Sequence, residues 1–256
     1  MQRNNIRPKK RLGQHFLTDE EIARRIAGLI PKDELPVLEI GPGTGVLTQY
    51  LTKVHQNIRM IEIDPRSVAY LHERFPEFRD RIMLGDFMEL HLESLFGSQF
   101  ALIGNYPYNL SNQIFFKLIE HKDLISVCAG MVQKEVADRI SSLPGKKTYG
   151  ITSVLLQMWY DVEYIFTVEP ESFNPPPKVR SAVIRLIRNG RRSLPCSEEA
   201  LKLVVKTAFN QRRKTLRNSL RQLISSKHGI FDHNFLSRRP EQLTVEDFIA
   251  LTMLLT

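Results

Sequence analysis

Pro36-Val37-Leu38-Glu39-Ile40-Gly41-Pro42-Gly43-Thr44-Gly45 is a short apolar run that continues directly into a glycine-rich turn. The apolar part is typical of a buried parallel strand, and residues 46–54 after the turn have a helical pattern. In such a turn Gly41 and Gly43 let the backbone pass close to a ligand, and the helix N terminus favours a negatively charged ligand group. The stretch therefore predicts the first strand, turn and helix of a nucleotide-binding type of α/β fold.

The next apolar run, residues 58–63, predicts a second strand with an acid near its end. Glu62 lies about 20 residues after the first glycine of the turn, where a carboxylate binds ribose hydroxyls in nucleotide-binding folds. Asp64 competes for this role, because strand alternation directs both side chains the same way. The residues alone leave the choice between the two acids open.

Two further strands are predicted to end at polar residues. Residues 81–84 lead to Asp86, which either accepts a hydrogen bond from the adenine amino group of a nucleoside cofactor or caps the next segment. Residues 100–104 lead to the loop Asn105-Tyr106-Pro107-Tyr108-Asn109. Ligands of open α/β sheets bind at this carboxyl edge. The loop after residue 104 is therefore the predicted reaction centre.

The 105–109 loop has the groups needed to methylate an aromatic exocyclic amine. Such an amine is a weak nucleophile because its lone pair is delocalised, and acceptors for its two N–H groups help to localise the pair. Two acceptors are the side-chain oxygen of Asn105 and the carbonyl of Tyr106, whose backbone is biased to extended geometry by the following proline. Pro107 stiffens the turn, and Tyr108 offers a ring on which a base stacks, worth roughly 1–3 kcal/mol. The alternative is an ordinary proline-containing turn.

The order of these features along the chain is more specific than any one of them. A glycine turn, two acids and an Asn-x-Pro-Tyr loop follow successive strands. This order resembles that of S-adenosylmethionine-dependent methyltransferases that act on amino groups. A nicotinamide dehydrogenase shares the first turn but does not need the Asn-x-Pro-Tyr loop.

The rest of the chain completes an α/β Rossmann-like sheet and adds a second domain. Residues 162–168 and 182–187 predict an antiparallel hairpin at the edge of a mostly parallel sheet, and four prolines stiffen the connection that contains Phe173. Phe173 is either a second wall for a flipped base or an anchor for the connection, and position alone slightly favours the anchor. The predicted parts are a basic arm and cofactor-capping segment over 1–18, the methyltransferase domain over 19–190 and an all-α RNA-binding domain over 191–256.

The last helix of the predicted C-terminal domain has a clear start. Residues 244–247 fit a capping box, in which Thr244 and Asp247 hydrogen-bond each other's backbone. Phe248, Leu251 and Leu255 follow at helical spacing and are predicted to be core residues.

Positive charge is concentrated at the start of the chain and at the start of the C-terminal domain. The chain has 36 Lys+Arg and 28 Asp+Glu, a formal net charge of +8, which favours an acidic partner such as nucleic acid. Helical spacing predicts that Arg213, Arg217 and Arg221 share one helix face. So one-sided a patch suits a phosphate backbone better than a merely solvated surface. The predicted RNA-binding residues are Arg11, Lys178, Arg212, Arg213, Lys214, Arg217 and Arg221.

Composition argues against several other classes of protein. Cys128 and Cys196 lie far apart without metal-type spacing, so we expect neither a disulfide scaffold nor a metal site. No apolar run reaches the ~20 residues that span a bilayer, and the start lacks the apolar segment of a secretory signal. We therefore expect a cytoplasmic protein that does not contact a membrane. Its positive charge and the lack of an obvious exposed apolar face predict a monomer.

Seven motifs spread over nearly the whole chain resemble those of one known family. They are Gly13-Gln-His-Phe-Leu17, Glu39-Ile-Gly-Pro-Gly43, Ile61-Glu-Ile-Asp64, Gly104-Asn-Tyr-Pro-Tyr-Asn109, Gln133-Lys-Glu-Val136, Phe173-Asn-Pro-Pro-Pro-Lys-Val179 and Phe209-Asn-Gln-Arg-Arg-Lys-Thr215. Together they are similar to the small-subunit ribosomal RNA adenine dimethyltransferase family. The resemblance implies contacts to S-adenosylmethionine from His15, Leu17, Gly41, Glu62, Asp86 and Asn105, and so favours Glu62 over Asp64.

The resemblance also gives expectations for the target base. It implies that Tyr108 and Phe173 sandwich the target adenine, which reverses the preference for Phe173 as an anchor. Tyr106 departs from the small aliphatic residue usual in the family. Because the chemistry uses the carbonyl of residue 106, we expect activity to survive with an altered pocket shape.

The function implied by the resemblance is dimethylation of N6 of two adjacent adenosines in small-subunit ribosomal RNA, within an assembling particle during ribosome biogenesis. One alternative is an antibiotic-resistance enzyme that methylates large-subunit RNA, and the 173–179 motif and the basic C-terminal domain argue against it. Another is a non-catalytic RNA-binding or transcription factor on the same fold. The presence of Asn105, Tyr108, Glu62 and Asp86 argues against that second alternative.

Overall fold

The structure is a computed structural model that describes residues 6, 8–9, 12–32, 34–225 and 233–256. It divides into two compact units, one formed by residues 1–137 and 162–188 and the other by residues 138–161 and 189–256. The predicted boundary at residue 190 lies within two residues of the third crossing between the units. Residues 138–161, which the sequence pattern had assigned to the methyltransferase domain, group with the C-terminal helices instead, because their helix packs on those helices.

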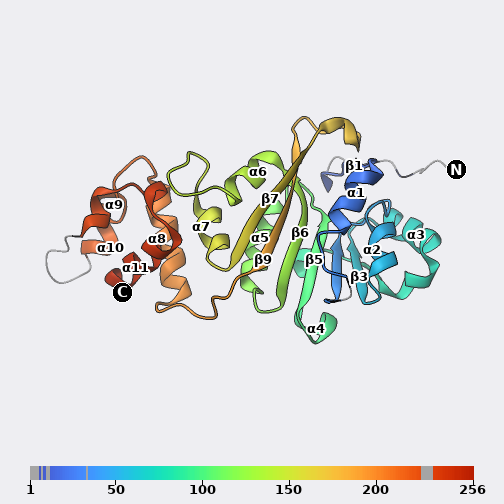
Figure 1. Cartoon of the computed structure of the whole chain (residues 1–256), viewed down its shortest axis with the longest axis horizontal. Coiled ribbons are helices and arrows are strands. Elements are labelled where there is room, and N and C mark those ends of the chain that lie inside the picture. The colour runs from blue at the N-terminus through green and yellow to red at the C-terminus, as the bar shows by residue number, and fades with distance from the viewer. Residues whose placement is uncertain (1–5, 7, 10–11, 33, 226–232) are drawn as a thin grey trace. The chain divides into compact units, whose positions relative to one another are not determined.

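The first unit is built on a seven-stranded sheet with the order β4-β3-β2-β5-β6-β9-β7 (Figure 1). The strands are β2 (Val37–Ile40), β3 (Ile58–Glu62), β4 (Ile82–Leu84), β5 (Phe100–Asn105), β6 (Ile125–Gln133), β7 (Tyr160–Val168) and β9 (Ser181–Arg188). Strands β4, β3, β2, β5 and β6 are parallel, β9 runs antiparallel to β6, and β7 lies beyond β9 at the edge. The predicted mostly parallel Rossmann-like sheet with antiparallel edge strands is confirmed.

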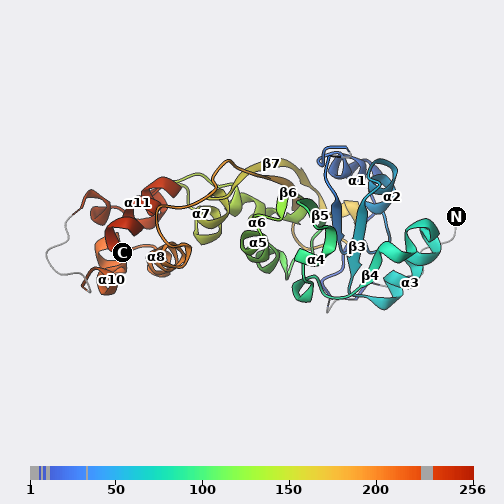
Figure 2. The same cartoon turned by 90° about the horizontal axis from the view of Figure 1, so that it is seen from below.

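Helices cover both faces of this sheet. They are α1 (Glu20–Ala27), α2 (Thr48–Val54), α3 (Pro65–Arg74), α4 (Glu93–Phe96), α5 (Ser111–Glu120) and α6 (Lys134–Ile140), the last of which crosses the boundary between the units. Figure 2 shows α1 and α2 on one side of the strands and α4 and α5 on the other. Short 3-10 turns cover Pro76–Arg81, Phe87–Glu89 and Pro170–Ser172.

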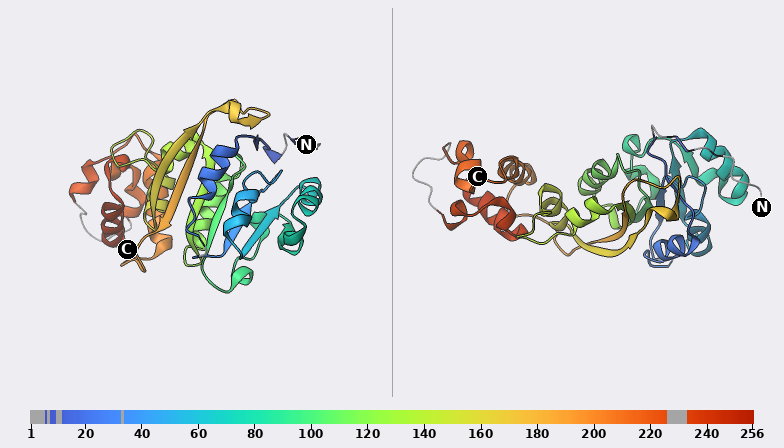
Figure 3. Two further views of the ribbon diagram at one scale, coloured as in Figure 1. Left: turned by 45° about the vertical axis from the view of Figure 1, so that its right-hand side comes forward. Right: turned by 90° about the horizontal axis from the view of Figure 1, so that it is seen from above.

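A two-stranded ribbon joins the start of the chain to the proline-rich connection. Strand β1 (Phe16–Leu17) pairs antiparallel with β8 (Phe173–Asn174), and Leu17 lies opposite Phe173. Figure 3 shows the connection that carries β8 reaching β1. Leu17 and Phe173 both belong to the hydrophobic core of the unit. The ribbon thus holds the segment before α1 in place.

The second unit is helical in the part that the structure describes, apart from the first two residues of β7. Its elements are α7 (Ile151–Gln157), α8 (Glu198–Asn210), α9 (Leu216–Ser219), α10 (Arg221–Ser225), α11 (Val245–Leu255) and 3-10 turns over Asn234–Ser237 and Pro240–Gln242. The capping box at α11 is confirmed, because Thr244 Oγ1 accepts from the Asp247 N–H and Asp247 accepts from the Thr244 N–H, each at 3.0 Å. The predicted core residues Phe248, Leu251 and Leu255 are buried.

The predicted helix that carried Arg213, Arg217 and Arg221 on one face is wrong. Helix α8 ends at Asn210, and these arginines lie in a turn, in α9 and in α10. The turn is closed by the Lys214 N–H, which donates to the Gln211 carbonyl at 2.8 Å, and the Leu216 N–H donates to the Arg238 carbonyl. A tertiary hydrogen bond and the burial of Leu216 outweigh continued helical spacing here.

Candidate active site

The carboxyl ends of β2, β3 and β5 and the segments after them enclose a cleft in the first unit. It contains about 770 Å³ of space between its lining atoms, and this figure includes space open to solvent. Residues 12–16 close one side of it. The predicted site residues that line the cleft are His15, Gly41, Gly43, Glu62, Asp86, Asn105, Tyr106, Pro107 and Tyr108. Leu17 and Phe173 do not line it.

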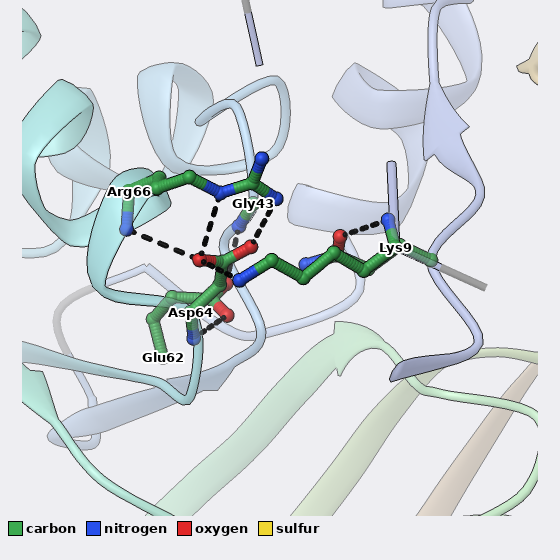
Figure 4. A network of polar contacts seen from close by, with 6 residues as sticks. Lys9, Gly43, Glu62, Asp64 and Arg66 are labelled. Atoms are coloured by element: carbon green, nitrogen blue, oxygen red, sulfur yellow. Dashed lines mark hydrogen bonds and ion pairs between the residues drawn. The ribbon is translucent and has the colours of Figure 1, made fainter. Parts of the chain in front are cut away.

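Glu62 is the last residue of β3 and is buried at the cleft (Figure 4). Its Oε2 accepts from the Gly43 N–H at 3.0 Å, and its Oε1 accepts from the Asp64 N–H at 2.9 Å. Burial raises the pKa of Glu62, and these backbone N–H groups oppose the rise. Each carboxylate oxygen keeps a further lone pair for a ligand hydroxyl. The backbone therefore fixes a carboxylate at the edge of the cleft.

The glycine turn is shaped to approach this carboxylate. Gly43 has a φ of +58°, and a Cβ there would lie 3.0 Å from the Phe16 ring. Only glycine adopts this backbone angle without strain and leaves room for the ring. The Gly43 N–H can then point at Glu62, so the turn orients the acid as well as leaving space for a ligand.

Asp64 has a different set of partners, although it lies only two residues after Glu62. It caps α3, accepting from the Arg66 N–H at 3.1 Å, and it forms ion pairs with Arg66 and with Lys9 at 2.8 and 3.0 Å (Figure 4). Hydrogen bonds from Arg66, with a further one from Lys9, hold the pKa of Asp64 well below its usual range. Strand alternation predicted the same direction for both side chains. Because β3 ends at Glu62, that alternation does not extend to Asp64.

Asp86 caps the next segment, which is one of the two roles that the sequence left open. Its Oδ1 accepts from the Met88 N–H at 2.8 Å and so caps the 3-10 turn Phe87–Glu89. It also lines the cleft together with Phe87 and Met88. A carboxylate can serve two donors at once, so capping does not remove Asp86 as a ligand contact.

Asn105 ends β5 with its side chain at the cleft. Its Nδ2 donates to the His15 carbonyl at 3.0 Å. Because the nitrogen is used in this way, Oδ1 is the acceptor on the other side of the amide. The segment before α1 thus determines which end of the Asn105 amide is presented.

Tyr106 is pinned to β6 by both its backbone and its ring. Its N–H donates to the Met131 carbonyl at 3.0 Å, and its hydroxyl donates to the Ala129 carbonyl at 2.8 Å. The ring is 1% exposed and lies against Gly130, where a Cβ would come within 2.8 Å of Tyr106 Cε2. The aromatic residue that departs from the family pattern is therefore accommodated between strands, with its hydroxyl directed toward β6.

Tyr108 and Phe173 are not brought together in this structure. The Tyr108 ring stacks on His15, with ring centroids 5.5 Å apart and an interplanar angle of 22°, and its hydroxyl is 2.5 Å from Ser181 Oγ. His15 Nδ1 is 2.8 Å from the Pro175 carbonyl oxygen. Phe173 is 3% exposed and packs in the core. In this arrangement Phe173 packs in the core and anchors the proline-rich connection.

Sequence reasoning missed a second buried acid beneath the glycine turn. Glu39, in the middle of β2, is 1% exposed, and its Oε2 accepts from Thr48 Oγ1 at 2.8 Å. Burial, together with the charge of Glu62, raises the pKa of Glu39 to about 8. The signal available in the sequence was an ionisable residue inside an otherwise apolar strand.

The predicted RNA-binding residues lie in both units. Arg213, Lys214, Arg217 and Arg221 are exposed in the second unit, and Lys178 is exposed in the first. Arg212 is half-buried, donates to the Lys146 carbonyl at 3.2 Å and lies 3.8 Å from Glu241, so it also has a structural role in its own unit. Arg11 lies outside the described residues.

The sequence is similar to known proteins over almost its whole length. Residues 5–251 match the family model described as ribosomal RNA adenine dimethylase. The chain belongs to this family. Ribosomal RNA small subunit methyltransferase A of Porphyromonas gingivalis is 60% identical over 253 residues, which are 98% of each of the two chains.

Solved structures agree with the fold of this dimethylase-family chain. A dimethyladenosine transferase from Plasmodium falciparum is 26% identical, with a TM-score of 0.78 over 93% of this chain and 96% of that one. The 23S ribosomal RNA methyltransferase ErmE is 24% identical, with a TM-score of 0.68 over 92% and 98% of the two chains. The second likeness shows the fold alone, so the fold does not by itself choose between the ribosomal subunits.

Two kinds of feature have no candidate in the described ranges of the chain. No helix there is long and apolar enough to cross a membrane. Nor do three or more histidine, cysteine, aspartate or glutamate side chains gather there as a candidate metal site.

Proposed function

We propose that this chain transfers methyl groups from S-adenosylmethionine to N6 of two adjacent adenosines in small-subunit ribosomal RNA. The observation that carries the proposal is the Asn105 amide, whose nitrogen is held by the His15 carbonyl so that its oxygen is the acceptor at the cleft. Membership of the ribosomal RNA adenine dimethylase family and the name of the Porphyromonas gingivalis relative support the reaction and the RNA.

The polar groups of the cleft fit S-adenosylmethionine. Glu62 has lone pairs for the ribose hydroxyls, and Asp86 has one for the adenine amino group. The backbone at Gly41 and Gly43 lines the cleft without side chains in the way. When bound, this cofactor supplies a methyl group on a positively charged sulfur, which keeps the bonding electron pair as the substrate nitrogen attacks.

Two acceptors prepare the substrate amine for attack. Asn105 Oδ1 and the Tyr106 carbonyl accept its two N–H groups, which localises the nitrogen lone pair. Tyr106 is suited to this because its N–H and its hydroxyl are both hydrogen-bonded to β6, which holds the residue that carries the carbonyl. The methylated amine is acidic enough to lose its proton to water, so the residues need only orient the amine.

Tyr108 is the proposed stacking platform for the adenine. It lines the cleft, and its hydroxyl is held near Ser181. For Phe173 to form the opposite wall, its side chain must leave its packing in the core. Tyr108→Ala should therefore reduce transfer at subsaturating RNA, and an equal loss in Phe173→Ala without a lower melting temperature would support the sandwich.

The exposed basic residues are the proposed RNA contacts. Lys178 in the first unit and Arg213, Lys214, Arg217 and Arg221 in the second provide positive charge for phosphates. We also propose that the RNA is presented in an assembling small-subunit particle, and that the protein acts as a cytoplasmic monomer. Sedimentation of the purified protein with and without such particles tests both the partner and the oligomeric state.

The decisive experiment is transfer of radiolabelled methyl groups from S-adenosylmethionine to undermethylated small ribosomal subunits. Large subunits and naked RNA serve as substrate controls, and nucleoside analysis identifies the product. Dimethyladenosine in small subunits alone supports the proposal. Label only in large subunits would point to the resistance-type enzyme, and tight RNA binding without label would point to a non-catalytic factor.

A further inference from the structure

Lys117 is a buried lysine on α5 that bonds the turn on the far side of the cleft. It is 7% exposed, and its Nζ donates to the carbonyls of Phe87, Met88 and Leu90 at 2.8, 3.0 and 2.7 Å. The ammonium has three N–H donors, and each meets one carbonyl. The Nζ also lies 5.0 Å from the centroid of the Phe87 ring, within the range of a cation–π contact.

Burying an ammonium is unfavourable unless its donors are satisfied. Burial lowers the pKa of Lys117, and the charges of Glu93, Asp86 and Glu120 oppose that change. Three carbonyl oxygens converging on one point repel one another unless a donor lies between them. Lys117 therefore determines the conformation of the turn as well as depending on it.

The turn that Lys117 holds is a wall of the cleft. Phe87 and Met88 line the cleft next to Asp86, whose carboxylate is itself held by the Met88 N–H. Helix α5 packs against this turn and begins soon after the 105–109 loop, and Ile114, one turn before Lys117, lines the cleft. The lysine thus bridges the helix that follows the reaction loop and the wall that carries Asp86.

We propose that Lys117 is a positioning residue that holds the 86–90 turn in the conformation that receives the adenine of the cofactor. This inference rests on the proposed function, because it takes the ligand of that wall to be an adenosyl group. The lysine acts through Asp86, Phe87 and Met88 and does not itself line the cleft. Loss of its three hydrogen bonds lets the turn rearrange, so cofactor binding weakens more than the chemical step does.

The test measures binding of S-adenosylhomocysteine to the full-length protein by isothermal titration calorimetry. The variants are Lys117→Met, which keeps the side-chain length without the donors, and Lys53→Met, a matched control at an exposed position of α2. Wild type and Lys53→Met should bind alike, and Lys117→Met should bind about tenfold more weakly. KM for S-adenosylmethionine should rise by a similar factor, with a smaller change in kcat.

A second ligand separates positioning from general stability. S-inosylhomocysteine has an oxygen in place of the adenine amino group, so wild type should prefer the adenosyl ligand. That preference should fall in Lys117→Met, whereas a merely structural role lowers the melting temperature and the active fraction without changing the ratio of the two affinities. If Lys117→Met does not fold, Lys117→Gln keeps two donors and should give an intermediate loss.

The outcomes distinguish the inference from the proposed function. Wild-type affinity and ligand preference in whichever Lys117 variant folds would overturn the positioning role. Failure of the wild-type protein to bind S-adenosylhomocysteine would instead overturn the proposed cofactor, whatever the variants do. A selective loss of adenosyl binding at Lys117 alone supports both.

Discussion

The carboxyl edge of the parallel sheet and the basic segment after α8 are both regions in which sequence patterns gather functional residues. At the sheet edge, the predicted residues from four strand ends and the segment before α1 line one cleft. In the basic segment, three arginines predicted to share a helix face lie in a turn and two separate short helices. The same kind of reasoning succeeded in the first region and failed in the second.

Sequence periodicity therefore located strand ends reliably but did not locate the end of helix α8. Parallel strands are held in register by hydrogen bonds to neighbours, so their ends meet at one edge whatever the loops contain. An exposed helix has no such neighbour to enforce its continuation. Its end is decided by tertiary contacts, here the bond from the Leu216 N–H to the Arg238 carbonyl.

The largest expected effect tests the sheet edge directly. Asn105→Ala should reduce methyl transfer by about 10²–10³-fold, because a preorganised hydrogen-bonding group at the reacting atoms is lost. RNA affinity should be nearly unchanged. Single-turnover transfer and filter binding measure the two quantities. Asn109→Ala, at an exposed position of the same loop, is the control, and equal loss of transfer and RNA binding in Asn105→Ala would contradict the assignment.

The buried acids make the sheet edge sensitive to pH. The pKa of Glu39 is raised to about 8, so between its ordinary value near 4.5 and about 8 the native state holds a proton that the unfolded chain has lost. Stability from this group is therefore fully present at low pH and is lost as pH rises through that window. Glu39→Gln should remove this fall, roughly 1–3 kcal/mol between pH 6 and 8.

Denaturant unfolding of wild type and Glu39→Gln across that pH range measures the difference. Thr48 Oγ1 can donate to the glutamine oxygen as it does to the acid, so the variant should keep its packing. Parallel stability curves for the two proteins would mean that Glu39 does not titrate with a raised pKa. The pKa of Glu62 is raised in the same direction, so part of the slope should remain.

A smaller effect separates the two neighbouring acids. Glu62→Gln should weaken S-adenosylhomocysteine binding about tenfold, since one ribose acceptor is replaced by a donor. Asp64→Asn should leave that affinity nearly unchanged and lower the melting temperature, because it weakens the cap of α3 and the ion pairs with Lys9 and Arg66. Calorimetric titration and thermal unfolding of both variants measure this; the reverse pattern would exchange the roles of the two acids.

The smallest expected effect is in the basic segment. Replacing Arg213 and Arg217 together by alanine should weaken RNA binding several-fold and reduce the slope of log affinity against log salt by about 2. Arg212→Ala should instead lower thermal stability, since that side chain contacts Lys146 and Glu241. An unchanged salt slope in the double variant removes both arginines from the interface.

The succession of strands and loops along the chain, the Asn-x-Pro-Tyr loop and the place of Glu62 near a strand end could all be predicted from the sequence. Each of these depends on local patterns: apolar runs, glycine turns and the residue before proline. Asp86 could be placed at the edge for the same reason, although only the structure shows that it accepts from the Met88 N–H and caps the next turn.

Contacts between residues that are distant in the sequence came from the tertiary structure alone. It placed Phe173 in the core beside Leu17, bonded Asn105 to His15 across 90 residues of sequence, and joined residues 138–161 to the C-terminal helices. It also gave Lys117 three carbonyl partners. The physical reason is that burial, hydrogen-bond satisfaction and pKa depend on atoms far apart in the chain, whereas strand and helix periodicity depends on neighbours.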